Sequence, residues 1–147
     1  MPPILDYRGV CKAFSGGGPV LDGFTLSVAP GETVVLVGPS GSGKTTALKL
    51  ANRLLEADSG EVRVFERPVG EQDPIARKAA QNEFRSWKKR LTSAVLLVTH
   101  DLREAFALGD RIAVVHEGRI RQAGSREDLT TRPADAFVRE FVSELAS

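Results

Sequence analysis

Two unbroken apolar runs stand out in the pattern of the chain. They are residues 33–37, Thr-Val-Val-Leu-Val, and residues 94–99, Ala-Val-Leu-Leu-Val-Thr. Short runs rich in β-branched residues predict buried strands, and the second run is continuous enough for a strand covered on both faces. The first run is followed by apolar residues at helical spacing, within residues 47–55. The second is followed by Asp101 and Glu104, a capping-box-like pair for a helix at residues 102–108. Both strands are therefore expected to lead into helices.

Five further stretches predict strands around this pair, and among them residues 61–65 alternate as a strand should. They are residues 4–14, 20–28, 61–65, 112–116 and 119–123. Glu117-Gly118 separates the last two as a hairpin turn would, and residues 67–70 are predicted to be loop. Asp58-Ser59-Gly60 is expected to stop the helix that precedes residues 61–65.

Three more helices are predicted from start signals. Asp73-Pro74 offers Asp at the N-cap and Pro at the first helical position. Ser125 opens a short helix, and Pro133 opens a last one with a single apolar stripe. Together the elements predict an α/β fold: a parallel sheet flanked by helices, an N-terminal antiparallel β layer and a C-terminal helix.

The stretch between the first apolar run and its helix carries the clearest chemistry. Its residues are Gly38, Pro39, Ser40, Gly41, Ser42, Gly43, Lys44, Thr45 and Thr46. They match the phosphate-loop pattern G-x-x-x-x-G-K-[ST] in the strand–loop–helix context that it needs. Glycines let backbone N–H groups turn inward, and the helix start adds unpaired N–H groups. We predict that Lys44 reaches the β/γ-phosphates of a nucleotide and that the Thr45 hydroxyl binds Mg²⁺; a Gly/Ser-rich loop without function is the alternative.

Length and composition limit the remaining possibilities. The 147 residues suffice for one domain, and 41% hydrophobic with 27% charged residues describes a folded chain. A net charge of +1 gives no reason to expect nucleic acid as a partner. Two histidines and one cysteine cannot form a typical zinc site or an intrachain disulfide. No apolar run approaches the length of about 20 residues that crosses a bilayer.

Three stretches resemble the ATP-binding subunit of ATP-binding-cassette (ABC) transporters of the importer type. They are Pro30-Gly31-Glu32 leading into the phosphate loop, Asp58-Ser59-Gly60-Glu61-Val62, and Leu96-Leu97-Val98-Thr99-His100-Asp101 with Gly109-Asp110-Arg111-Ile112 beyond it. Asn52-Arg53-Leu54 and the segment from Pro133 to Phe141 are most similar to quaternary-amine and osmoprotectant importers. The resemblance covers both ends of the chain.

The resemblance implies roles for two more residues. Phe14 matches the aromatic that stacks on adenine, with an ordinary core Phe as the alternative. His100 matches the histidine that contacts the γ-phosphate and orients the attacking water, with a plain helix-start residue as the alternative. Asp101 ends an apolar strand as a Mg²⁺ ligand would, but the preceding Thr-His pair favours a helix cap.

Four elements of the family pattern are missing from this sequence. They are a strand-ending glutamine, an α-helical subdomain, a Leu-Ser-Gly-Gly-Gln signature and an apolar strand ending in Asp-Glu. Only 55 positions separate Thr45 from His100, too few to contain them. Residues 14–17, Phe-Ser-Gly-Gly, are similar in sequence to the signature but precede a strand. We therefore reject the interpretation that they are the signature. The sequence therefore reads as a single domain, residues 1–147, with its middle excised and the junction near residues 69–81.

The family's sheet order implies what the excision removes. It places the phosphate-loop strand between the strand before His100 and the strand at residues 112–116, with the lost strands beyond the first of these. The deletion would then expose an apolar edge at residues 95–98, and exposed edges promote pairing between chains. We expect instability or self-association into a homo-oligomer.

The resemblance implies MgATP as ligand, with a membrane permease and a second ATP-binding subunit as partners. It also implies a cytoplasmic location, with peripheral attachment to the inner face of the membrane left open. Because the general base, the Mg²⁺-binding carboxylate and the signature are absent, we expect ATP binding with feeble or no hydrolysis. Two alternatives stay open: an interaction or remnant protein that uses no nucleotide, and another phosphate-loop enzyme such as a small kinase.

Overall fold

The predicted α/β architecture is present in the computed structural model, which describes residues 3–64, 67–68 and 94–146. The described strands form two sheets of four. The first has the order β2-β1-β4-β5 and the second the order β6-β3-β7-β8. The strands are β1 (Leu5–Ala13), β2 (Pro19–Val28), β3 (Thr33–Val37), β4 (Ser59–Val64), β5 (Arg67–Pro68), β6 (Val95–Val98), β7 (Arg111–His116) and β8 (Arg119–Gly124). The described helices are α1 (Lys44–Ala51), α3 (Leu102–Leu108), α4 (Arg126–Thr131) and α5 (Ala136–Ala146).

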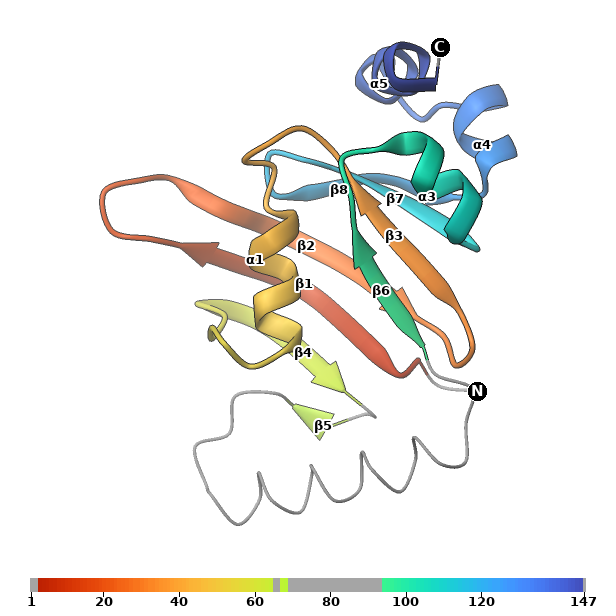
Figure 1. The fold of residues 1–147 in the computed structure, drawn as a ribbon. Helices are drawn as coiled ribbons and strands as arrows, with labels where there is room; N and C mark the ends of the chain where they lie inside the picture. The colour runs from red at the N-terminus through yellow and green to blue at the C-terminus, as the bar shows by residue number, and fades with distance from the viewer. Residues whose placement is uncertain (1–2, 65–66, 69–93, 147) are drawn as a thin grey trace.

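The second sheet has the predicted central arrangement. β3 pairs in parallel with β6 on one side and with β7 on the other, while β8 returns antiparallel to β7. The first sheet is antiparallel throughout its described pairs, as expected for the N-terminal layer. Figure 1 shows this layer and α1 on one side of the second sheet, and α3, α4 and α5 on the other.

Two hydrophobic cores explain why β3 is an unbroken apolar run. Side chains alternate across a strand. Val34 and Leu36 therefore pack into the core shared with the antiparallel layer and α1, whereas Val35 and Val37 pack into the core beneath α3, α4 and α5. All four side chains are at most 1% exposed. Tyr7 ties the layers together, since its buried hydroxyl donates to the Ala47 carbonyl at 2.6 Å.

The first helix ends earlier than predicted. We expected it to continue to about Leu55, but α1 stops at Ala51. Arg53 adopts a left-handed φ of 64°, and the N–H groups of Arg53 and Leu54 donate back to Leu50 and Lys49. This pair of bonds is a Schellman motif, which ends helices and is more often built on glycine. An arginine at this position gave no signal in the sequence.

Three other boundaries are corrected. Ser59 and Gly60 belong to β4, and Arg67–Pro68, expected in a loop, forms the short strand β5 paired with β4. The last helix begins at Ala136 because the Asp135 carboxylate accepts a hydrogen bond from the Val138 N–H at 2.8 Å. Pro133 precedes this cap, so it does not open the helix.

The strand before His100 is less buried than predicted. All four residues of β6 are half-buried, because within the described sheet it has a neighbour on one side only.

The helix predicted from Asp73-Pro74 and the junction near residues 69–81 lie outside the described residues. No described helix combines the length and apolar character that crossing a membrane requires.

Candidate phosphate-binding site

The predicted phosphate loop joins the end of β3 to the start of α1. Ser42 N–H donates to the Pro39 carbonyl at 3.2 Å, which closes a four-residue turn. Gly41 is the third residue of this turn, and its φ of +79° is the left-handed value that favours glycine there. Gly38 is required for another reason: a Cβ at this position would lie 2.1 Å from the Val115 carbonyl oxygen of β7. The loop therefore begins in close contact with the backbone of β7.

Lys44, the first residue of α1, folds back over the loop. Its ammonium group donates to the carbonyls of Gly38 and Pro39, the second at 3.0 Å. Burial lowers the pKa of Lys44 from its ordinary value. An ammonium group has three donors, so two carbonyl bonds leave one for an anion at the mouth of the loop. The ammonium group therefore lies over the loop, and its contact with the phosphates of a nucleotide stays a prediction.

Ser42 offers a polar group that lacks a partner. The residue is 4% exposed, and its hydroxyl forms no hydrogen bond within the described part of the chain. Buried hydroxyls are usually hydrogen-bonded. An unpaired oxygen in this loop fits a site whose ligand completes the bonding, and the donors present suit a phosphate rather than a cation.

The start of α1 is open to a ligand. Gly43 occupies the N-cap with a φ of +107° and offers no side chain to satisfy the first N–H groups. Thr45 is exposed in the first helical turn, and Thr46 is half-buried. No group of three or more His, Cys, Asp or Glu residues in the described segments could hold a metal ion. Thr45 occupies the position whose hydroxyl binds Mg²⁺ in this motif.

His100 lies at the same sheet edge as the loop. Leu36 of β3 is in register with Val98 of β6, so the two parallel strands end side by side. Thr99 N–H donates to the Leu36 carbonyl at 3.1 Å, and His100 follows as an exposed residue. Gly38 begins the loop two positions after Leu36, as His100 follows Val98. The fold thus brings together two segments that are far apart in the sequence.

Asp101 is a helix cap in this structure. Its carboxylate accepts hydrogen bonds from the N–H groups of Arg103 at 2.9 Å and Glu104 at 3.3 Å, at the start of α3. The cap interpretation, favoured over a Mg²⁺ ligand, agrees with this geometry. The carboxylate is occupied by its own helix.

Phe14 lies at the end of β1 and is 45% exposed. The Lys12 ammonium is 5.4 Å from its ring centroid, and the Asp58 carboxylate accepts the Ala13 N–H at 2.7 Å. The backbone before Phe14 is therefore fixed while much of the ring is open. The alternative of an ordinary buried core residue does not describe it.

A turn that we predicted only as a hairpin connection also contacts the loop. Gly118, between β7 and β8, donates its N–H to the Ser42 carbonyl at 2.9 Å. A single sequence gives no signal for this contact, because Glu117-Gly118 predicts only a two-residue turn.

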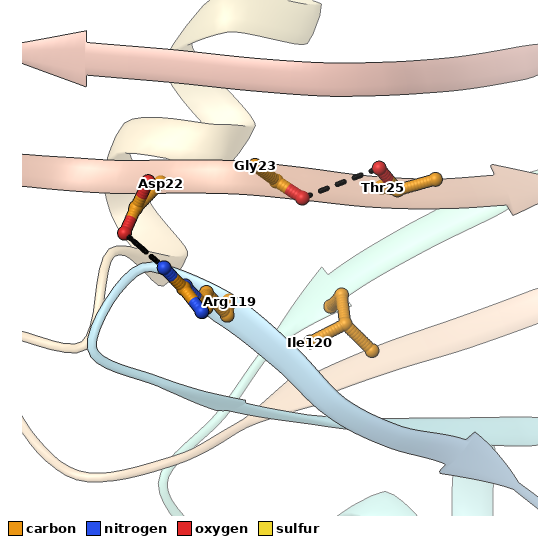
Figure 2. A pocket seen from close by; sticks show the side chains of 5 residues that line it. All are labelled: Asp22, Gly23, Thr25, Arg119 and Ile120. Atoms are coloured by element: carbon orange, nitrogen blue, oxygen red, sulfur yellow. Dashed lines mark hydrogen bonds and ion pairs between the residues drawn. The ribbon is translucent and has the colours of Figure 1, made fainter.

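A shallow pocket of about 270 Å³ lies beside this turn, between β2 and β8 (Figure 2). It is lined by Asp22, Gly23, Thr25, Arg119 and Ile120. The pocket shares no residue with the phosphate loop.

Comparisons with known proteins agree with the resemblance seen in the sequence. A profile of the ABC transporter family matches residues 21–135. The choline transport ATP-binding protein OpuBA of Bacillus subtilis is 24% identical over 238 residues, covering 96% of this chain and 62% of OpuBA. The osmoprotectant import ATP-binding protein OsmV of Salmonella typhimurium is 45% identical over 92 residues, covering 63% of this chain and 24% of OsmV.

A solved structure described as an ATP binding subunit of an ABC transporter has the same fold. It superposes with a TM-score of 0.70 at 16% identity, over 98% of this chain and 100% of the solved one. The present chain spans less than two thirds of the length of the transport proteins it matches. The alignment with OpuBA extends over 238 residues, whereas this chain has 147, so at least 91 positions have no counterpart here.

Proposed function

The chain belongs to the ABC transporter family, and we propose that it binds ATP with Mg²⁺ through residues 38–46. The observation that carries the proposal is the structure of the loop. Its turn requires glycine, the Lys44 ammonium group has one N–H that is not used by the loop carbonyls, and the buried Ser42 hydroxyl has no hydrogen-bond partner among the described residues. In this reading the donors of the loop and the start of α1 hold the phosphates. Mg²⁺ would neutralise part of the phosphate charge, held on the protein side by Thr45.

Two residues complete the proposed site. His100 shares the sheet edge with the loop, in keeping with a contact to the terminal phosphate. Phe14 presents an open ring on which adenine can stack, and such stacking contributes about 1–3 kcal/mol per base. Both assignments rest on the family pattern together with the positions of these residues.

We propose that hydrolysis is feeble or absent. The sequence contains no Asp-Glu strand and no signature, and loss of a general base alone typically lowers the rate by a factor of about 10²–10⁴. The alignment with OpuBA is longer than this chain, in keeping with a single domain whose middle has been excised. The proposed junction near residues 69–81 rests on the sequence pattern alone. The proposed partners are a permease and a second ATP-binding subunit, at the cytoplasmic face of a membrane. The names of the relatives suggest a choline-like osmoprotectant as the solute.

Calorimetric titration with MgATP tests the proposal. Wild-type protein should bind, and Lys44→Ala should bind roughly 10–100-fold more weakly, because a hydrogen bond to a charged group is worth about 1.5–3 kcal/mol. Lys49→Ala is the matched control, since Lys49 is an exposed lysine at the other end of α1 and should not matter. Phosphate release should be slow or undetectable in all three proteins.

Two results would contradict the proposal. Wild-type protein that shows neither binding heat nor a thermal shift with MgATP would favour the interaction or remnant alternative. Robust phosphate release that Lys44→Ala abolishes would show that the predicted loss of hydrolysis is wrong.

A further inference from the structure

The turn between β7 and β8 bridges the phosphate loop and the antiparallel layer. Gly118 uses both of its backbone groups: its N–H donates to the Ser42 carbonyl at 2.9 Å, and its carbonyl accepts from the Asp22 N–H at 3.0 Å. Gly118 thus connects the phosphate loop to β2, which belongs to the antiparallel first sheet.

The bond to Ser42 sets the direction of a neighbouring donor. The Ser42 carbonyl and the Gly43 N–H belong to one planar trans peptide, in which they point in opposite directions. Because the carbonyl points outward to Gly118, the Gly43 N–H points inward, toward the interior of the loop. No hydrogen bond is formed by this N–H among the described residues. It is therefore a donor held ready at the N-cap of α1.

The backbones around Gly118 leave no room for a side chain. A Cβ on Gly118 would lie 2.4 Å from the Val20 carbonyl oxygen and 2.8 Å from the Leu21 Cα. A Cβ on Gly43 would meet the same Val20 oxygen at 2.8 Å. β2, the phosphate loop and the hairpin turn thus converge, and they can do so because both positions are glycine.

An ion pair holds the turn from its outer side. Arg119, the first residue of β8, donates to the Asp22 carboxylate at 2.6 Å, and Figure 2 shows this pair spanning β2 and the hairpin. Gly118 carries a φ of +78° and Glu117 one of +52°, as a two-residue hairpin turn of this kind requires. The position of Gly118 is therefore determined from both sides.

We propose that Gly118 is a positioning residue for nucleotide binding: it orients the Gly43 N–H toward the phosphates by fixing the Ser42 carbonyl. This inference rests on the proposed function of the loop. The inference predicts that a displacement of the turn between β7 and β8 weakens nucleotide binding, although no group that contacts the nucleotide is changed.

Gly118→Ala tests the inference, because its Cβ forces the turn away from Val20 and thereby from Ser42. MgATP affinity should fall about tenfold or more, the value of a lost hydrogen bond to a charged group. Gly9→Ala is the control: Gly9 has a φ of +56° but open space around its Cβ position. It should lower the melting temperature through backbone strain and leave the affinity unchanged. Titrations are made well below the melting temperature of each variant.

Amide hydrogen exchange of the wild-type protein provides a second measurement that does not depend on the variant folding. The Gly118 N–H should be protected without nucleotide, and the Gly43 N–H should become protected only when MgATP is added. Rapid exchange at Gly118, or an unchanged affinity in folded Gly118→Ala, would overturn the inference alone. Wild-type protein that does not bind MgATP would contradict the proposed function and this inference with it.

Discussion

At the scale of single residues, the chemistry of a side chain depends on which partners the fold provides. Asp101 could be a Mg²⁺ ligand or a helix cap when only its place after an apolar strand is known. Its two hydrogen bonds to the first N–H groups of α3 show that it caps the helix. Lys44 shows the reverse case: the motif predicts a role for it in binding phosphate, but does not predict its bonds to the Gly38 and Pro39 carbonyls.

Substitution of Asp101 separates the two roles. Asp101→Ala should lower the free energy of unfolding by about 1 kcal/mol, the usual cost of a lost N-cap. Asp101→Asn should preserve stability, because asparagine caps helices as well as aspartate does. It should also leave the Mg²⁺ dependence of ATP binding unchanged. A strong loss of that dependence in Asp101→Asn would show that the carboxylate serves the metal.

At the scale of elements, α5 is joined to the sheet by an aromatic stack. The ring of Phe137 lies 3.8 Å from that of His116 at the end of β7, with the planes 8° apart. The Arg121 guanidinium lies 5.7 Å from the same ring and is bonded to the Asp135 carboxylate at 2.9 Å. The sequence predicted the apolar stripe of this helix, and in the structure the stripe packs on the chain's own core.

Phe137→Ala tests how much this contact stabilises the fold. Full truncation of a buried Phe costs about 3–5 kcal/mol, and Phe137 is only half-buried, so we expect about 2 kcal/mol. Arg139→Ala, an exposed position on the same helix, should change the free energy of unfolding by less than about 0.5 kcal/mol. Chemical denaturation of the three proteins measures the difference. Equal stability of Phe137→Ala and wild type would show that α5 does not depend on the stack.

At the scale of the whole molecule, the central sheet persists although the chain is much shorter than its relatives. β3 keeps a parallel neighbour on each side, so the phosphate loop retains its support. β6 is an edge strand among the described residues, and its apolar side chains are half-buried. The N–H groups of Val95 and Thr99 donate to the carbonyls of Glu32, just before β3, and of Leu36 within it. In a parallel ladder the N–H groups of Leu96 and Val98 therefore point away from β3.

We predict self-association through this edge. The melting temperature should rise with protein concentration, as mass action requires for a folded state stabilised by association. Leu96→Pro removes an outward donor without removing a bond to β3, and it should shift the protein toward the monomer in sedimentation experiments. A wild-type monomer whose melting temperature is independent of concentration would contradict the prediction.

The sequence by itself determined which segments form the main strands, where the phosphate loop lies and which residue caps α3. These features depend on neighbours within a few residues. Apolar runs, glycines at fixed spacing and a capping aspartate act locally. Only the tertiary structure decided where α1 ends, how Lys44 is bonded, and that Gly118 contacts Ser42 across 76 positions of sequence. In each case the partner is a backbone group, which is nearby in the sequence for α1 and Lys44 and in a distant segment for Gly118. A backbone group leaves no mark on the identity of the residue that carries it.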